Sequence, residues 1–300
     1  HLAGGGDVVW QIGTAYFGCR TRDGDFDPDA FRERATLPNV RMIELKLSQG
    51  AKPGHGGVLP AAKNSEEIAK IRLIEPGTVV RSPPGHRTFS DAEGMLRFVD
   101  RLRTLADGKP VGIKLCLGRE AEFAELCEAM KRLDLYPDFV TVDGAEGGTG
   151  AAPLEFPDAV GIPLEPALSA VDRLLREHGV RDRVRVIASG KILTAVSLLR
   201  ALCYGADLCN AARAFMLAVG CIQAQRCDTN SCPTGVATQR PDLVKGLVVE
   251  QKKDRVANYH AATLEALRDL LAACGVDDLA DLRPDLFLEP NHWRHGRGAT

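Results

Sequence analysis

The feature that most constrains the fold is a regular alternation of short apolar runs with longer stretches of helical periodicity. Six apolar runs that are typical of strands lie at residues 40–47, 78–82, 111–117, 139–143, 185–189 and 206–210. Each precedes a stretch of helical character, at residues 65–72, 91–105, 120–133, 166–178, 194–202 and 213–224. Nearly continuous apolar strands alternating with helices are typical of a parallel sheet with both faces covered. We therefore predict an α/β protein of about six βα units.

Two parallel architectures fit this alternation, an open doubly wound sheet and a closed barrel. The GxGxxG motif of dinucleotide-binding sheets is absent from the sequence, which argues against the first. A (β/α)8 barrel needs eight units, two more than the six runs supply. Residues 8–12 are also apolar and are an alternative source of an irregular extra strand. Asp27 and Ser90 are the expected N-caps of helices at residues 27–35 and 91–105.

The pattern changes after residue 240. Apolar residues recur at helical spacing from Val256 to Leu271, and Gly275 follows where a glycine commonly ends a helix. We predict a βα domain over residues 1–240, a helical extension packed on its outside over residues 241–290, and a disordered tail over residues 291–300.

Composition excludes several classes of function. A net charge of −2 over 300 residues gives no basic surface of the kind that nucleic-acid-binding domains carry. No run of about eighteen apolar residues occurs, so no membrane span is expected. The nine cysteines are an odd number without the spacing of a small secreted disulfide framework. A reducing cytoplasm is therefore the expected location.

Three cysteines, Cys221, Cys227 and Cys232, lie in one stretch, CIQAQRCDTNSCPTGVATQ. Their spacing, C-x5-C-x4-C, has neither the CxxC pairs nor the nearby histidines of common zinc sites. Thiolates are soft ligands, and three of them on one irregular loop suit an iron–sulfur cluster. The alternative is three ordinary buried thiols, since free cysteine is often buried. Proline and glycine in DTNSCPTG disfavour a core helix here.

Polar residues follow the predicted strands, where barrel enzymes carry their active sites. Lys46 lies near the end of the run at 40–47, and Lys52 lies in the glycine-rich stretch that follows. Lys114 lies inside a strand and so needs a buried partner, which a neighbouring carboxylate would also supply. The glycines of DGAEGGTG favour a backbone nest around a ligand, with Asp143 and Glu146 either as acid–base groups or as residues that orient the loop.

These stretches together resemble the FMN-binding synthase domain of the glutamate synthase family. The resemblance rests on the cysteine stretch, on LKLSQGAKPGHGGVLPAAK at residues 45–63 and on DGAEGGTGAAPL at residues 143–154, in the family's order. It covers roughly residues 10–271 and is closest to the stand-alone form, which lacks the amidotransferase half. The family fold is a (β/α)8 TIM barrel. The resemblance therefore implies an N-terminally incomplete barrel holding strands three to eight, with the first two strands largely upstream.

The resemblance also implies cofactors and residue roles. Cys221, Cys227 and Cys232 match the ligands of a [3Fe-4S] cluster. Lys46, Lys52 and Arg72 match the residues that hold 2-oxoglutarate beside the flavin, and they are the expected catalytic residues. The loops after the last two strands are the usual phosphate site of this fold. The residues assigned to FMN are Gln49, Lys114, Asp143, Gly147, Gly148, Ser189, Gly190, Lys191, Ala211 and Arg213.

The implied activity is that of an oxidoreductase acting on CH–NH2 donors (EC 1.4 class), the reductive amination of 2-oxoglutarate to glutamate. Electrons are expected to come from ferredoxin or an NAD(P)H-reductase subunit, through the cluster, to FMN. Ammonia or another amine donor and the keto acid are expected to condense near Lys52. No glutaminase nucleophile is recognised in the chain, so free ammonia or an amidotransferase subunit is the expected nitrogen source.

Val58 leaves alternatives open. Large glutamate synthases have glutamine at the matching position, in contact with the keto acid, and a valine side chain makes no hydrogen bond. A keto acid bound differently, or another keto acid, is therefore an alternative, as is the activity of the N-methylglutamate synthase large subunit, which shares these loops and which Val58 fits equally. A non-catalytic electron-transfer or interaction module is a second, because an incomplete barrel leaves the flavin pocket open. An IMP-dehydrogenase-like barrel with a nucleophilic cysteine is a third, which three clustered cysteines disfavour.

Overall fold

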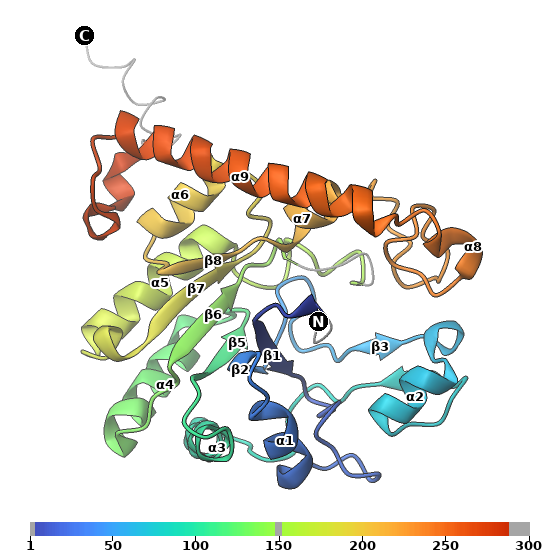
Figure 1. Cartoon of the computed structure of the whole chain (residues 1–300). Helices are drawn as coiled ribbons and strands as arrows, with labels where there is room; N and C mark the ends of the chain where they lie inside the picture. Colours follow the sequence, from blue (N-terminus) through green and yellow to red (C-terminus); the bar gives the residue numbers. More distant parts are fainter. Residues whose placement is uncertain (1–3, 148–151, 288–300) are drawn as a thin grey trace.

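A computed structural model describes residues 4–147 and 152–287 (Figure 1). Its centre is a six-stranded sheet in the order β1-β2-β5-β6-β7-β8, in which every neighbouring pair is parallel. The strands are β1 Val8–Ile12, β2 Val40–Lys46, β5 Val111–Leu115, β6 Phe139–Asp143, β7 Arg185–Ser189 and β8 Leu208–Asn210. Because the strand order follows the chain order, each βα unit lies beside the one before it, as in a barrel.

Between these strands, the short α2 Glu66–Arg72 lies apart from the sheet, and the other helices lie on one face of it (Figure 1). They are α1 Pro28–Ala35, α3 Ala92–Leu105, α4 Glu120–Leu133, α5 Leu164–Glu177 and α6 Ala195–Cys203, and each contacts the next in this order. A doubly wound sheet carries helices on both faces, whereas a barrel keeps them outside. The predicted (β/α)8-type barrel with about six βα units is thus confirmed as an open half-barrel, with β1 and β8 at the sheet's edges.

The core lies between the sheet and these helices. Strand residues that face the helices are apolar and fully buried, among them Ile43, Leu45, Ile113, Val140, Val142, Val186 and Ala188. Side chains alternate across a strand, so the residues between these point to the opposite, inner face. On the inner face the sequence places polar residues instead, including Glu44 and Lys46 of β2 and Lys114 of β5. The sheet of the half-barrel therefore presents an apolar face to the helices and polar side chains on its inner face.

One predicted strand is not part of this sheet. Residues 78–82 form only the short strand β4 Val80–Arg81, which pairs antiparallel with β3 Val58–Leu59. Val79 remains 54% exposed, so this run lacks the buried faces of a central strand. Residues 8–12 form β1, which takes the place of residues 78–82 as a strand of the six-stranded sheet. The alternative of an extra strand at residues 8–12 is therefore confirmed. It is irregular as expected, with a shift of register between Val8 and Val9.

Helix boundaries follow local capping chemistry. Asp27 caps α1 as predicted, and α2 Glu66–Arg72 begins at the N-cap Ser65. The N-cap of α3 is Asp91 and not Ser90, because the Asp91 carboxylate accepts the N–H of Gly94 at 2.7 Å. The helix predicted over 213–224 is the shorter α7 Ala212–Ala218, and the chain turns away two residues later at Gly220, where φ is 109°.

The C-terminal helix is α9 Val249–Ala273, which crosses the outside of α6 and α7 (Figure 1). Tyr259 of α9 donates to the carbonyl of Leu193 at 2.6 Å, and Gly275 has the left-handed φ of 67° expected after a helix end. The short α8 Pro241–Val244 precedes it, and 3-10 turns follow at Leu279–Asp281 and Pro284–Leu286. The predicted tail at 291–300 lies outside the described residues. Among those that are described, no helix has both the length and the apolar character needed to cross a bilayer.

Candidate functional site

The predicted site residues of the inner face gather where the strands end. Lys46 ends β2 and lies opposite Lys114 of β5 in the parallel register. Asp143 ends β6 and lies opposite Ser189, the last residue of β7. Because parallel strands end at the same edge of a sheet, side chains from four distant parts of the chain meet there. This C-terminal edge is where barrel enzymes carry their chemistry.

Asp143 is the hydrogen-bonding centre of this group, and it is only 4% exposed. Its Oδ2 accepts the backbone N–H of Gly50 at 2.8 Å and lies 3.7 Å from the Nζ of Lys114. Its Oδ1 accepts the hydroxyl of Ser189 at 2.8 Å. One carboxylate therefore joins the loop after β2 to β5, β6 and β7. It is also the neighbouring carboxylate that was the alternative partner for Lys114.

Two glycines let the loops approach Asp143 this closely. A Cβ at position 50 would lie 1.8 Å from the carbonyl oxygen of Gly144, and a Cβ at position 147 would lie 2.8 Å from Asp143 Oδ1. Glu146, which directly precedes Gly147, accepts the N–H of Leu164 at 2.9 Å, so it fixes its loop to the start of α5. The glycine-rich pattern thus serves close backbone packing, and the predicted Gly148 lies outside the described residues.

Lysine ammonium groups concentrate in this region. Lys46 Nζ donates to Gln49 Oε1 at 3.0 Å, and Lys52 is 8% exposed. Burial lowers the pKa of Lys46, and the charges of Lys114 and Lys52 lower it further. Burial also lowers the pKa of Lys52, whose Nζ has no hydrogen bond or ion pair within residues 4–147 and 152–287. An anionic ligand stabilises the charged form of lysines whose pKa is lowered by burial in this way.

Glu44 is a buried carboxylate that sequence reasoning missed. It is 6% exposed and shares the inner face with Lys46. Its Oε2 accepts the hydroxyl of Thr141 at 2.6 Å, and its Oε1 accepts from the side-chain amide of Gln11. Its charge opposes the lowering of the Lys46 pKa. The signal was available, since two charged residues two apart in VRMIELK must share one face of a strand.

The remaining predicted residues lie on neighbouring loops. Arg72, at the end of α2, places its guanidinium over the ring of Phe17, 4.7 Å from the centroid, and burial lowers its pKa. Lys191 Nζ lies 3.5 Å from the Asp158 carboxylate at the surface. Gly190, between Ser189 and Lys191, has a φ of 149° that favours glycine. Ala211 is the N-cap position of α7, and Arg213 lies in its first turn.

The cysteine loop, residues 221–239, follows α7 as turns without a core helix. Cys221 and Cys227 are half-buried, Cys232 is buried, and all three are free thiols. Among the described residues, no three His, Cys, Asp or Glu side chains are grouped to hold a single metal ion. A zinc ion would bring its thiolates to about 3.8 Å of one another, since Zn–S bonds are about 2.3 Å. The assignment of the loop to an iron–sulfur cluster therefore stays a prediction.

Two of the three sulfur atoms of this loop, those of Cys221 and Cys232, lie within hydrogen-bond distance of polar groups. The Cys221 sulfur accepts the backbone N–H of Gln223 at 3.4 Å, and the Cys232 sulfur lies 3.5 Å from the Thr234 hydroxyl. Burial acts to raise the pKa of Cys232. Hydrogen bonds from the Thr234 hydroxyl and from the backbone N–H groups of residues 234, 236 and 237 outweigh it, so the pKa lies below the ordinary thiol value. This environment stabilises a thiolate, the form that ligates metals.

Lys63 joins the cysteine loop to the loop after β2, and sequence reasoning missed it. Its Nζ donates to the carbonyl of Ala237 at 2.9 Å and to the carbonyl of Cys227. Beside it, the side-chain amide of Asn230 donates to the carbonyl of Ala62 at 3.2 Å. No sequence signal predicts these bonds, because their acceptors are backbone carbonyls more than 160 residues away.

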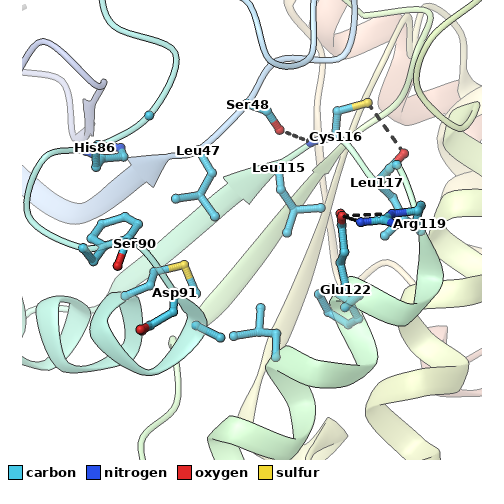
Figure 2. Close-up of a pocket in the computed structure, with 17 residues that line it drawn as sticks. Leu47, Ser48, His86, Ser90, Asp91, Leu115, Cys116, Leu117, Arg119 and Glu122 are labelled. Atoms are coloured by element: carbon cyan, nitrogen blue, oxygen red, sulfur yellow. Dashed lines mark hydrogen bonds and ion pairs between the residues drawn. The ribbon is translucent and has the colours of Figure 1, made fainter.

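A cavity of about 490 Å³ opens beside this site, between the ends of β2 and β5 and the first turns of α3 and α4 (Figure 2). Its lining is mostly apolar, with Leu47, Leu115 and Leu117 on the strand side. His86 Nε2 lies 2.9 Å from the Lys46 carbonyl, which only accepts, so this nitrogen carries the proton. Burial lowers the His86 pKa and keeps the ring neutral. None of the predicted site residues lines this cavity, although its lining includes Ser48, next to Gln49.

Comparisons with known proteins identify the family. The family model described as a conserved region in glutamate synthase matches residues 1–277. A glutamate synthase large subunit-like protein of Bacillus subtilis, YerD, is 46% identical over 277 residues, covering 92% of this chain and 52% of that protein. An archaeal glutamate synthase [NADPH] of Methanocaldococcus jannaschii is 40% identical, covering 80% of this chain and 47% of that protein. The chain thus spans about half the length of these relatives.

A ferredoxin-dependent glutamate synthase of Synechocystis is 35% identical, covering 84% of this chain and 16% of that protein. Among solved structures, a flavocytochrome b2 double mutant with sulfite bound superposes with a TM-score of 0.54 at 14% identity, covering 97% of this chain and 60% of that chain. A flavocytochrome b2 mutant with benzoylformate gives a TM-score of 0.52 at 13% identity, covering 97% and 59%. At such identities these two structures show the fold alone. With its half-barrel, its cysteine loop and a family model that matches 277 residues, this chain belongs to the glutamate synthase family.

Proposed function

We propose that this chain is the flavin- and cluster-binding part of a glutamate synthase-type oxidoreductase, which reductively aminates 2-oxoglutarate to glutamate. The observation that carries the proposal is the gathering of Lys46 and Lys52 with the Lys114–Asp143 pair at one strand edge, joined to the cysteine loop. Membership of the family and relatives named glutamate synthase support it. EC class 1.4 and a cytoplasmic location belong to the same proposal.

The keto acid is proposed to bind at Lys46, Lys52 and Arg72. A dicarboxylate needs cations with no closer anionic partner, and Lys52 meets this condition among the described residues. Gln49 orients the Lys46 ammonium through their 3.0 Å hydrogen bond. Burial of these lysines strengthens their attraction to a carboxylate, because water screens it less. The three residues would thus hold and orient the substrate and would keep water from it.

FMN is proposed to bind across the C-terminal edge. Lys114 would meet the polar edge of its ring, with Asp143 holding the ammonium in place. The loops of residues 189–191 and 211–213 would hold the phosphate, at the position where barrels commonly bind one. The close packing at Gly50 and Gly147 supports a fit, since it fixes these loops in one arrangement. Bound FMN supplies hydride transfer, which side chains do not.

Cys221, Cys227 and Cys232 are proposed to ligate a [3Fe-4S] cluster, which relays electrons when bound. The N–H groups aimed at the Cys232 and Cys221 sulfurs support this, because hydrogen bonds to ligand sulfurs are a feature of iron–sulfur sites. Ferredoxin or an NAD(P)H-reductase subunit would deliver the electrons. The relatives named as ferredoxin-dependent and as [NADPH] enzymes support either donor.

The proposal is tested by glutamate formation from 2-oxoglutarate and ammonia, with a chemical reductant or reduced ferredoxin as donor. We expect Lys52→Met to raise the KM for 2-oxoglutarate at least tenfold, because it removes a buried cation. Lys70→Met, at an exposed position of α2 outside the proposed binding residues, is the control for a nonspecific charge effect on KM. A protein that binds FMN and cluster but forms no glutamate from ammonia or glutamine refutes this activity.

A second candidate is the transfer of an alkylamine, as in the large subunit of N-methylglutamate synthase. It shares the loops on which the resemblance rests, and Val58, in β3, fits either activity, because it is apolar and 39% exposed and has no group to hydrogen-bond a keto acid. Parallel assays with ammonia and methylamine decide between the two. The expected product is glutamate with ammonia under the first proposal and N-methylglutamate with methylamine under the second.

A third candidate is a non-catalytic electron-transfer or interaction module. The two unpaired edges of the half-barrel, β1 and β8, favour it, because the inner face between them is open. Titration with FMN, followed by flavin fluorescence, separates this candidate from the enzymes. Absence of quenching would support the module.

A further inference from the structure

The cysteine loop and the loop after β2 meet at one side chain. The loop after β2, residues 47–63, carries Gln49 and Lys52 and ends in the 3-10 helix Ala61–Lys63. The Lys63 ammonium donates to two carbonyls, those of Cys227 and Ala237, which lie on either side of Cys232 in the sequence. An ammonium has three donors and no acceptor, so two aimed carbonyls use most of its capacity. A surface lysine without a structural role would not be held in this way.

A second contact fixes the same junction. Asn230, in the left-handed conformation with φ of 58°, donates from its amide to the Ala62 carbonyl at 3.2 Å. Its Oδ1 accepts the N–H of Gln239 at 2.7 Å and the Thr238 hydroxyl at 3.0 Å. Asn230 therefore closes the cysteine loop on itself and attaches it to the residue before Lys63. Three hydrogen bonds in all hold the two loops together.

We propose that Lys63 is a positioning residue that holds the cysteine loop against the loop carrying Gln49 and Lys52, so that the cluster ligands and the keto-acid site keep one fixed arrangement. The contact is a property of the chain itself, and its consequence for turnover rests on the proposed function. Because the ammonium adjoins the backbone of Cys227, its charge would stabilise added electrons on a cluster held by this loop. Lys63 would therefore raise the reduction potential of such a cluster, besides holding the cysteine loop at a fixed distance from the keto-acid site.

The contact is tested first in the intact protein without cofactors. Lys63→Met keeps the length of the side chain and removes the donor and the charge. We expect alkylation of Cys227 by iodoacetamide, read by mass spectrometry, to become about tenfold faster, because two charge-assisted hydrogen bonds are lost. Lys63→Arg is expected to restore most of the protection. Lys70→Met, an exposed lysine of α2, is the matched control and leaves the rate unchanged.

A second variant guards against a general loss of folding. Asn230→Asp keeps the acceptors within the cysteine loop but turns a donor facing the Ala62 carbonyl into an acceptor. It is expected to expose Cys227 in the same way, while far-UV circular dichroism and the labelling of the fully buried Cys127 stay unchanged. Equal Cys227 labelling in wild type, Lys63→Met and Asn230→Asp would overturn the proposal.

With cofactors bound, the same variants separate this inference from the proposed function. Lys63→Met is expected to lower the reduction potential of the cluster and to raise the KM for the keto acid, with both restored in Lys63→Arg. A potential that does not differ between Lys63→Met and wild type overturns the electrostatic part. A protein that binds neither iron nor FMN refutes the proposed function, while the labelling experiment still decides the role of Lys63.

Discussion

Lys114 Nζ lies 3.7 Å from Asp143 Oδ2, and this pair is the only ion pair among the described residues in which both side chains are less than one fifth exposed and come from neighbouring sheet strands. Asp143 also accepts from Gly50 and Ser189. The carboxylate therefore serves the fold and the site together. It neutralises one lysine and leaves the charges of Lys46 and Lys52 for a ligand.

Replacing Asp143 by Asn tests this dual role. Asn keeps an oxygen for hydrogen bonds but leaves Lys114 as an uncompensated buried charge. We expect the free energy of unfolding, measured in urea, to fall by about 3 kcal/mol. Asp158→Asn, which removes an exposed pair with Lys191, should change it by about 1 kcal/mol or less. Equal effects of the two variants would contradict a buried role for Asp143.

Gly50→Ala tests the close approach of the loop after β2 to β6. The added methyl group would lie 1.8 Å from a backbone oxygen that has little freedom to move. We expect a loss of unfolding free energy of about 2 kcal/mol or more, with weaker FMN binding. The control is Gly57→Ala, where the nearest atom would be the Ser82 hydroxyl oxygen at an ordinary 3.4 Å. A Gly50→Ala protein as stable as Gly57→Ala would show that the loop packs differently.

Lys46→Met tests the buried charge through pH. Burial, with Lys114 and Lys52 nearby, lowers the folded-state pKa of Lys46 below its ordinary value of 10.5. Between these two pKa values the unfolded chain binds more protons, so wild-type stability rises with pH there. We expect Lys46→Met to be more stable than wild type near neutral pH in ligand-free protein. That advantage should shrink as the pH approaches 10.5.

The same variant should bind 2-oxoglutarate more weakly, because stability and anion binding make opposite demands on this charge. In wild type, keto-acid affinity should fall as rising pH deprotonates Lys46, and this dependence should be weaker in Lys46→Met. Lys70→Met, at an exposed position, serves as the control, with a stability change within about 0.5 kcal/mol. A variant with no pH-dependent difference from wild type would rule out a strained Lys46.

Thiol labelling tests the different states of the nine cysteines. Burial raises the pKa of Cys19 and Cys127 to about 12, so neither forms a thiolate near neutral pH. Cys221 and Cys227 are half-buried and reachable. In cofactor-free protein we expect both to be alkylated well before Cys19 and Cys127. Reconstitution with iron and sulfide should protect them, and continued labelling after reconstitution would argue against cluster ligation.

Much of the fold could be predicted because it depends on local patterns. Apolar runs with helices between them are enough to predict a parallel sheet, and the predicted caps Asp27 and Ser90 place their helix starts within a residue of the observed caps Asp27 and Asp91. The error at residues 78–82 has a physical cause. A short Val-rich run looks the same in a central sheet and in a separate two-stranded pair, and only its antiparallel pairing with Val58–Leu59 distinguishes them.

The sequence predicts which charged residues lie at the strand ends. It does not predict contacts that depend on how distant loops pack against each other. The position of Lys46, Lys114 and Asp143 at strand ends follows from the alternation of strands and loops. The contacts of Lys63 with Cys227 and Ala237 do not, because backbone carbonyls carry no sequence signature. The sequence does place Glu44 on the same strand face as Lys46, but not its bonds to Gln11 and Thr141, which come from strands whose register the sequence does not specify.

Cofactor analysis of the natively purified protein is the sharpest test of whether this chain binds both a flavin and an iron–sulfur cluster. We expect about one FMN and about three iron atoms with inorganic sulfide per chain. We also expect that Cys232→Ser lowers the iron content while FMN is retained. A folded wild-type protein that contains neither flavin nor iron, and takes up neither on reconstitution, would contradict the account.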